Sequence, residues 1–127
     1  MTGELTEQVT EQVTEQAIET VKLEIFIPEP QAHLLRDELA KIGVGKIGNY
    51  DHCSSISKVS GSWRPLPGSD PYHGEIGKLE VGEECRLDMN CARNLLPAAL
   101  EVVHRVHPYE TPLVNIVPLL NHLFDPI

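Results

Sequence analysis

The chain has 127 residues and a mass of 14.1 kDa, which suffices for one domain with a hydrophobic core and is too little for two. Its 10 Lys and Arg against 19 Asp and Glu give a formal net charge of -9. This balance argues against general nucleic-acid binding and against adhesion to an anionic membrane, because both need clustered positive charge. Residues 1–20 hold five Glu and no base, so residues 21–127 carry 14 acids against 10 bases, a net charge of -4.

The cellular compartment is predicted from the apolar runs, the N-terminus and the cysteines. No apolar run approaches the roughly 18 residues of a membrane helix. The N-terminus has neither the basic nor the apolar region of a signal peptide. Three cysteines are an odd number and do not resemble a disulfide framework. We therefore expect a reduced, soluble, cytoplasmic protein that binds no nucleic acid and no membrane.

Residues 1–20 contain a tandem repeat of Thr-Glu-Gln-Val. Leu5, Val9, Val13 and Ala17 recur every four residues and would form a thin apolar stripe on a helix. A helix this short is marginal in water, and Thr and Val favour it only weakly. The segment is therefore either a disordered acidic tail or a short helix that docks on the body or on a neighbouring subunit. The folded domain is predicted at 21–127.

The first half of that domain begins with a strand over 21–27, where apolar and other residues alternate. Pro28 and Pro30 end the strand, and proline suits the first turn of the helix that follows. The apolar positions of that helix are Leu35, Leu39 and Ile42, with Leu34 beside them, and Gly43 or Gly45 ends it. A weaker strand signal covers 51–59.

The second half opens with residues 61–77, which are rich in Gly, Ser and Pro and predict a long excursion or irregular hairpin. A strand over 79–91 has an apolar face formed by Cys85, Leu87, Met89 and Cys91. A second helix is predicted with Asn94 as its N-cap and Pro97 in its first turn, and residues 113–119 form a last strand. This order predicts an α+β, ferredoxin-like (split βαβ) sandwich, an antiparallel four-stranded sheet with an extra hairpin.

Six histidines and three cysteines raise the possibility of a metal site. His104 and His107, at i and i+3, can share a helix face, but a metal needs further ligands, and the helix dipole also favours His in a last turn. His52 follows a glycine-rich loop, where polar groups are often displayed for function, and lies beside Cys53. Cys85 and Cys91 are predicted to pack as small hydrophobic residues. The chain has no nucleophile elbow and no His-Glu-x-x-His pattern, so no set of catalytic partners is visible.

Four motifs, in order, resemble the Nif-three-like (YqfO and YbgI) family. The first runs from Gly45 to Ser54 (GKIGNYDHCS), and the second from Gly61 to Pro71 (GSWRPLPGSDP). The third is GEIGKLE from Gly74 to Glu80, and the fourth is HPYETP from His107 to Pro112. In larger members these motifs lie in a central insert domain that is similar in fold to the CutA and PII signalling proteins.

The resemblance implies that this chain corresponds to the insert domain standing alone. The family's implied two-metal site lies in flanking halves that are absent here, so its hydrolase-like chemistry is not carried over. CutA-like and PII-like relatives form trimers by edge-strand pairing and bind small ligands or metal ions between subunits. The resemblance therefore implies a homo-oligomer, with a trimer favoured, and a four-stranded sheet does have two edges to cover.

We expect a non-enzymatic binding or regulatory protein that binds a metal ion or small ligand at subunit interfaces. A metal-dependent hydrolase acting on a small phosphorylated compound and a protein interaction module are the alternatives. Trp63 would pin its loop or anchor an interface, and Glu110 would bond backbone amides or a neighbour. The ligand-binding or interface candidates are Asn49, Tyr50, His52, Cys53, Trp63, His107, Tyr109 and Glu110. A divalent metal, if bound, would use His52, His104 and His107.

Overall fold

The structure is a computed structural model that describes residues 18–124. Most of the acidic tail predicted at 1–20 lies outside these residues. The elements are β1 (Thr20–Ile27), α2 (Glu29–Lys41), β2 (Ser55–Trp63), β3 (Glu80–Ala92), α3 (Leu96–Val106) and β4 (Leu113–Leu119), with short 3-10 turns at Arg93–Leu95 and Asn121–Leu123.

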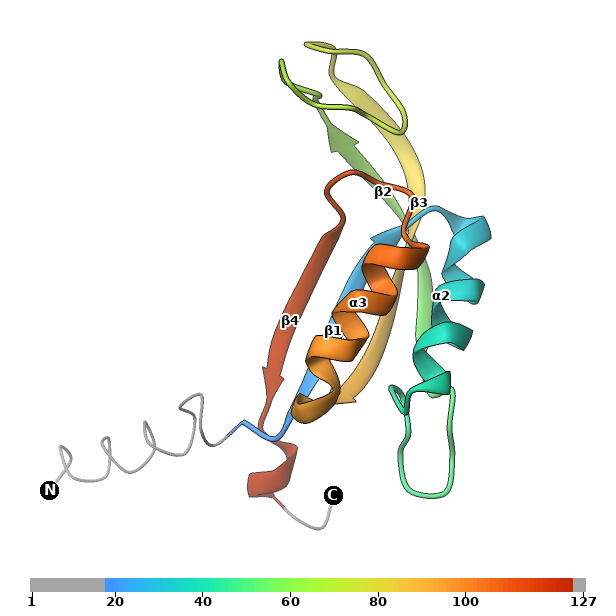
Figure 1. The fold of residues 1–127 in the computed structure, drawn as a ribbon, viewed down its shortest axis with the longest axis vertical. Helices are drawn as coiled ribbons and strands as arrows, with labels where there is room; N and C mark the ends of the chain where they lie inside the picture. Colours follow the sequence, from blue (N-terminus) through green and yellow to red (C-terminus); the bar gives the residue numbers. More distant parts are fainter. Residues whose placement is uncertain (1–17, 125–127) are drawn as a thin grey trace, which may run out of the picture.

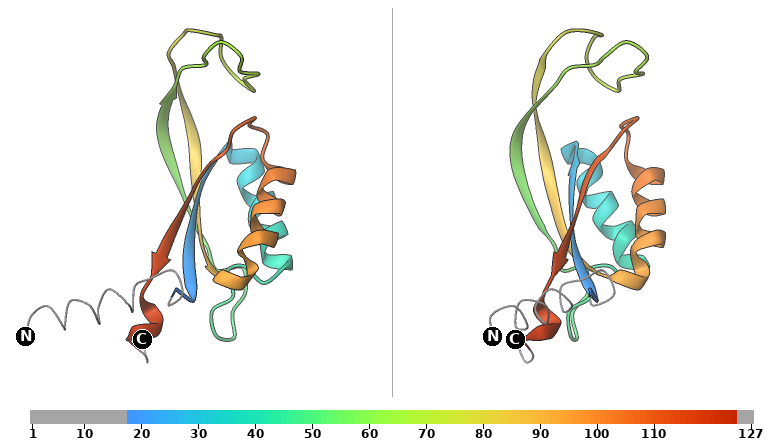
Figure 2. Two further views of the ribbon diagram at one scale, coloured as in Figure 1. Left: turned by 60° about the vertical axis from the view of Figure 1, so that its left-hand side comes forward. Right: turned by 90° about the vertical axis from the view of Figure 1, so that its left-hand side faces the viewer.

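The four strands form one sheet in the order β2-β3-β1-β4, with every neighbouring pair antiparallel. Both helices cover the same face of this sheet, and the other face carries no helix among the described residues (Figures 1 and 2). The strand order and the two helices confirm the predicted α+β, ferredoxin-like sandwich.

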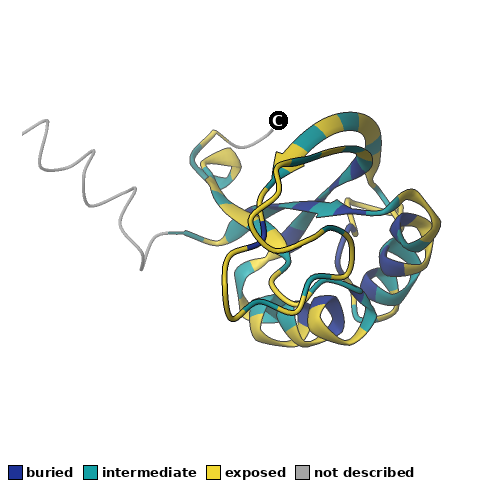
Figure 3. Cartoon of the chain, turned by 90° about the horizontal axis from the view of Figure 1, so that it is seen from above, coloured by how far each residue is buried: buried dark blue, intermediate teal, exposed yellow. Residues whose placement is uncertain are grey.

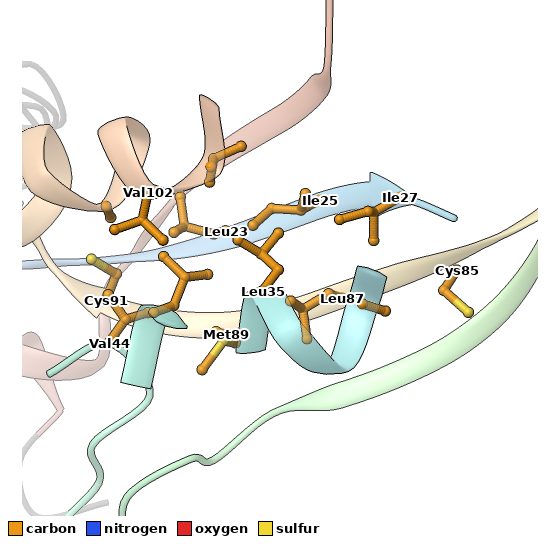
Figure 4. Close-up of a cluster of buried hydrophobic side chains, with 14 of the residues drawn as sticks. Leu23, Ile25, Ile27, Leu35, Val44, Cys85, Leu87, Met89, Cys91 and Val102 are labelled. Carbon is orange, nitrogen blue, oxygen red and sulfur yellow. The ribbon is translucent and has the colours of Figure 1, made fainter. Parts of the chain in front are cut away.

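The core lies between the sheet and the helices (Figure 4). β1 alternates along its whole length, so that every second side chain, Leu23 and Ile25 among them, is buried. The predicted apolar face of β3 is also buried, including Cys85 and Cys91, both of which are free thiols. Burial raises the pKa of each of these thiols, which keeps them protonated and unreactive, as expected of packing residues.

The two helices begin and end differently. α2 ends in a Schellman motif, in which Gly43 N–H donates to the Ala40 carbonyl and Val44 N–H donates to the Leu39 carbonyl. The prediction that Asn94 caps the second helix is wrong: a 3-10 turn precedes α3, which has no side-chain cap and starts at Leu96.

Neither α2 nor α3 is long and apolar enough to cross a bilayer, and no other helix in 18–124 is.

β2 and β3 continue beyond the rest of the sheet as a two-stranded hairpin. Residues 59–63 pair with residues 80–84, past the part of β3 that pairs with β1. The predicted second strand is thus displaced toward the C-terminus, because Gly61 and Ser62 extend the ladder opposite Gly82 and Val81 instead of breaking it. The loop 64–79 then hooks back over the α3–β4 connection (Figure 2) and is largely exposed (Figure 3).

Gly45 is the glycine whose replacement we expect to cost most. Its φ is +80°, and an added Cβ would lie 2.8 Å from the Cys53 carbonyl oxygen and 2.6 Å from Met89 Cε. Gly48 has a φ of +57° but nothing within 4 Å of an added Cβ. Both alanine variants carry the backbone penalty, and overpacking should make Gly45→Ala less stable by about 1 kcal/mol more than Gly48→Ala in urea denaturation. Equal losses would contradict this explanation.

Candidate functional site

The structure separates the eight candidate residues into two groups. Asn49, Tyr50, His52 and Cys53 lie in the loop 42–54 that follows α2, whereas Trp63, His107, Tyr109 and Glu110 lie at the other end of the sheet. Figure 1 shows the loop after α2 at the bottom of the molecule, and the α3–β4 connection and the end of β2 above the middle. A single site cannot therefore use both groups within one chain.

Three residues of the second group, Trp63, Tyr109 and Glu110, line a cleft of about 410 Å³, here called the aromatic cleft. His107 does not line it but accepts a hydrogen bond from the Tyr109 backbone. One wall comes from the end of β2 and the loop after it, and the other from residues 109–113. The volume lies within the usual range for small-molecule sites. Its principal lining residues are Phe26, Trp63, Arg64, Tyr72, Glu84, Tyr109 and Glu110.

A chain of hydrogen bonds supports the inner wall of the aromatic cleft. The Tyr109 hydroxyl donates to Glu84 Oε2 at 3.1 Å, and the Tyr109 backbone N–H donates to His107 Nδ1 at 3.2 Å. His107 Nδ1 is therefore an acceptor, so the proton is assigned to Nε2, which donates to the Phe26 carbonyl oxygen at 2.6 Å. The network joins the end of β1 to β3 through the segment after α3.

Burial sets the protonation of this network. His107 is 6% exposed, and burial lowers its pKa below the ordinary 6.5 despite the opposing bond to Phe26. Burial, reinforced by the negative charge of Glu84, raises the pKa of Tyr109 to about 12. At neutral pH the imidazole is neutral and the phenol stays protonated, which are the states that the hydrogen bonds require.

The outer wall of the aromatic cleft is held by two contacts across the loop 64–79. Trp63 Nε1–H donates to the His73 carbonyl oxygen at 3.0 Å, and the indole packs where a Cβ at Gly82 would lie. Trp63 thus pins its loop, which is one of its two predicted roles. Glu110 Oε2 accepts from the Asp70 backbone N–H at 2.8 Å, so its carboxylate does bond a backbone amide.

Most of the residues that line the aromatic cleft were not predicted from the sequence, and Tyr72, Glu84 and Phe26 are among them. Tyr72 lies with its ring centroid 5.7 Å from that of Tyr109, and Glu84 accepts the bond from Tyr109. Phe26 lies on the β1 face opposite the core. The sequence signal for Phe26 is an apolar side chain on the strand face that otherwise carries Lys22 and Glu24. In the structure Phe26 pairs with Leu113 on β4.

The loop 42–54 has different chemistry. An open, polar hollow of about 430 Å³ is lined by Lys46, Gly48, Asn49, Tyr50 and Asp51. His52, with a φ of +56°, bonds the Asp51 carboxylate through Nδ1 at 2.9 Å. Cys53 is half-buried, and its backbone N–H donates to the Gly45 carbonyl. These contacts explain the shape of the loop without a ligand.

The predicted metal ligands are not brought together within one chain. His52 lies after α2, and His107 lies at the opposite end of the sheet with His104 one turn before it. Across residues 18–124, no three His, Cys, Asp or Glu side chains gather in a way that could hold a metal ion. A metal bound by this set would need ligands from a second copy.

Removing the Tyr109 hydroxyl tests the inner wall. Tyr109→Phe keeps the ring but loses the bond to Glu84, and we expect the free energy of unfolding to fall by about 0.5 to 1.5 kcal/mol. Tyr50→Phe is the matched control, since Tyr50 is 75% exposed and its hydroxyl makes no hydrogen bond to the described residues. Chemical denaturation of both variants checks this, and equal stability of the two would contradict it.

Relatives of the chain were found among curated sequences, although no family model matches it. The GTP cyclohydrolase 1 type 2 homolog of Bacillus subtilis is 35% identical over 98 residues, 77% of this chain and 26% of that protein. The protein of the same name from Halalkalibacterium halodurans is 33% identical over 100 residues, 79% of this chain and 27% of that protein. The chain thus spans about a quarter of the length of these curated relatives.

Solved structures give the same result. A Bacillus cereus protein related to NIF3 matches with a TM-score of 0.71 and 31% identity, over 80% of this chain and 26% of that chain. The divalent ion tolerance protein CutA1 of Ehrlichia chaffeensis matches with a TM-score of 0.62 over 82% of this chain and 84% of that one, but at 16% identity it shows the fold alone. The resemblance to the Nif-three-like family, with a CutA-like fold, is confirmed.

Proposed function

We propose that this chain, a relative of the Nif-three-like proteins, is a binding or regulatory module that takes a small ligand in the aromatic cleft. The observation that carries the proposal is the cleft itself: about 410 Å³, lined by aromatic rings with a few polar groups. Apolar walls with few convergent polar groups are typical of small-molecule sites. The hydrogen-bonded inner wall and the pinned loop support a cleft that is already formed before binding.

Trp63 provides the test, because it is the only tryptophan of the chain and lines the cleft. Ligands that enter should change its fluorescence, so a panel of small aromatic compounds, nucleotides and amines can be screened by titration. Calorimetry then confirms the hits, and Trp63→Phe should weaken each of them. A panel without any hit on the correctly folded protein would contradict the proposal.

We further propose that copies of the chain assemble, with a trimer favoured. Both edge strands, β2 and β4, are unpaired on their outer sides among the described residues, and an unpaired strand edge is a template for a second chain. Ligand sites would then lie near subunit junctions, because the cleft is built on β2 and on the residues before β4. The mass in solution, measured by light scattering across a range of concentrations, tests this, and a monomer at all of them would contradict it.

Binding is favoured here over hydrolysis of a small phosphorylated compound. The curated relatives are named as GTP cyclohydrolase homologs, but this chain matches only about a quarter of each. Turnover of GTP or of a phosphoester panel that follows the protein through purification would overturn the preference. The metal-ion version is tested by elemental analysis after dialysis against mixed divalent ions, with His52→Ala and His107→Ala as the variants that should lose the metal.

A further inference from the structure

The aromatic cleft combines four phenyl, phenol or indole rings with two carboxylates, and the imidazole of His73 lies beside Trp63 in the same lining. The rings are those of Phe26, Trp63, Tyr72 and Tyr109, and the carboxylates are those of Glu84 and Glu110. Tyr72 and Tyr109 approach with an interplanar angle of 46°, so their ring faces are not stacked flat on one another. Ring faces carry negative electrostatic potential, which attracts a cation placed over them.

The Glu84 carboxylate is available to accept a hydrogen bond from a ligand in the aromatic cleft. Its Oε2 accepts the Tyr109 hydroxyl, and it forms no ion pair with a Lys, Arg or His of the described residues. Its Oε1 lies 3.1 Å from where a Cβ at Gly61 would be, so the glycine leaves room beside this oxygen. A half-buried carboxylate next to aromatic rings lacks the cation that would normally compensate its partial desolvation.

Neither basic residue in the lining, Arg64 or His73, fills this role. The His73 ring packs beside Trp63, and His73 forms no ion pair within residues 18–124. Arg64 is exposed, and within residues 18–124 it forms no ion pair with either carboxylate of the cleft. Glu110 already accepts from the Asp70 amide and holds the loop in place. The inner part of the cleft is therefore acidic and aromatic, and an anionic ligand there would face Glu84 directly.

We infer that the aromatic cleft binds an organic cation, a protonated amine carried on a flat or apolar body. The ammonium group would lie between the ring faces and donate to Glu84, and the body would contact Pro65, Leu66 and Pro71. This inference rests on the proposed function, because it specifies the ligand class of the same cleft.

Three probes of similar shape separate charge from ring contact: phenethylamine, 2-phenylethanol and phenylacetate. Each is titrated into the full chain and followed by Trp63 fluorescence and by calorimetry. The amine should bind about tenfold more tightly than the neutral alcohol, and the carboxylate should bind most weakly.

Glu84→Gln keeps an acceptor for Tyr109 but removes the charge, so it should abolish the preference for the amine over the alcohol. Glu83→Gln is the matched control: it removes the same charge from the adjacent residue, which is exposed and does not line the cleft. This control should keep the tenfold preference.

The outcomes separate this inference from the proposed function. Binding of phenylacetate or of a nucleotide with no amine preference would overturn the cation assignment and leave a ligand-binding cleft standing. An amine preference that survives Glu84→Gln would overturn the role of Glu84. Failure of every probe and of the wider panel would overturn both.

Discussion

Replacing Leu35 by alanine is expected to lower the free energy of unfolding by about 2 to 5 kcal/mol, because the change empties part of the hydrophobic core. Leu35 is fully buried on the face of α2 that packs on the sheet (Figure 4). Alanine removes most of the apolar area that the side chain takes from water, and it leaves a cavity that the surrounding β-strands can close only in part. Urea denaturation of both proteins measures the difference.

Leu34 provides the matched control in the same helix. It is the same residue type, adjacent in sequence, and 51% exposed on the outer surface of α2. Leu34→Ala should change the stability by less than about 0.5 kcal/mol. If the two variants lost equal stability, α2 would not pack on the sheet through the face that includes Leu35, and the described core would be wrong.

The strands and helices were predictable where one face alone is buried. β1 lies between two strands with helices on one side, so its alternation of Leu23 and Ile25 with Lys22 and Glu24 follows directly from burial. The last strand was predicted with the bounds that β4 has. In both cases the local pattern and the tertiary packing agree, and local signals are then sufficient.

The sequence pattern did not predict the bounds of an element where strand pairing or a local turn, rather than residue composition, decides them. β2 is an edge strand with few apolar residues, and Gly61 looked like a break, yet the register with β3 carries the ladder on to Trp63. Asn94 has the right chemistry for a cap, but the chain turns into a 3-10 helix before α3 begins. Neither outcome depends on neighbouring residues alone, so no local motif could have predicted it.

The candidate site was predictable only in part for a related reason. Trp63, Tyr109 and Glu110 were identified from their motifs, but Glu84 and Tyr72 come from separate segments that only the fold brings to the same cleft. Glu84 lies on β3 directly opposite Val59 and beyond the end of β1. Its partnership with Tyr109 depends on how far the hairpin extends past the sheet, which sequence patterns did not determine.

His107 joins the fold to the cleft, so its loss should affect both. His107→Leu removes the partner of the Phe26 carbonyl and of the Tyr109 N–H, and the unpaired groups should cost about 2 to 3 kcal/mol of stability. Its exposed neighbour supplies the control: His104→Gln, three residues earlier on α3, should change the stability by less than about 0.5 kcal/mol. Urea denaturation at pH 7.5 measures both.

The pH dependence of stability shows whether His107 contributes through the hydrogen bonds of its neutral imidazole or through packing alone. Since burial lowers the pKa of His107 in the folded chain, the unfolded chain binds a proton more readily below pH 6.5. The contribution of His107 to stability is therefore complete above pH 6.5 and is lost as the pH falls from there toward the folded-state pKa. The difference in stability between the unsubstituted chain and His107→Leu should narrow over this range. A difference that stayed constant from pH 7.5 to pH 5 would mean that burial does not lower the pKa of His107 in the folded chain.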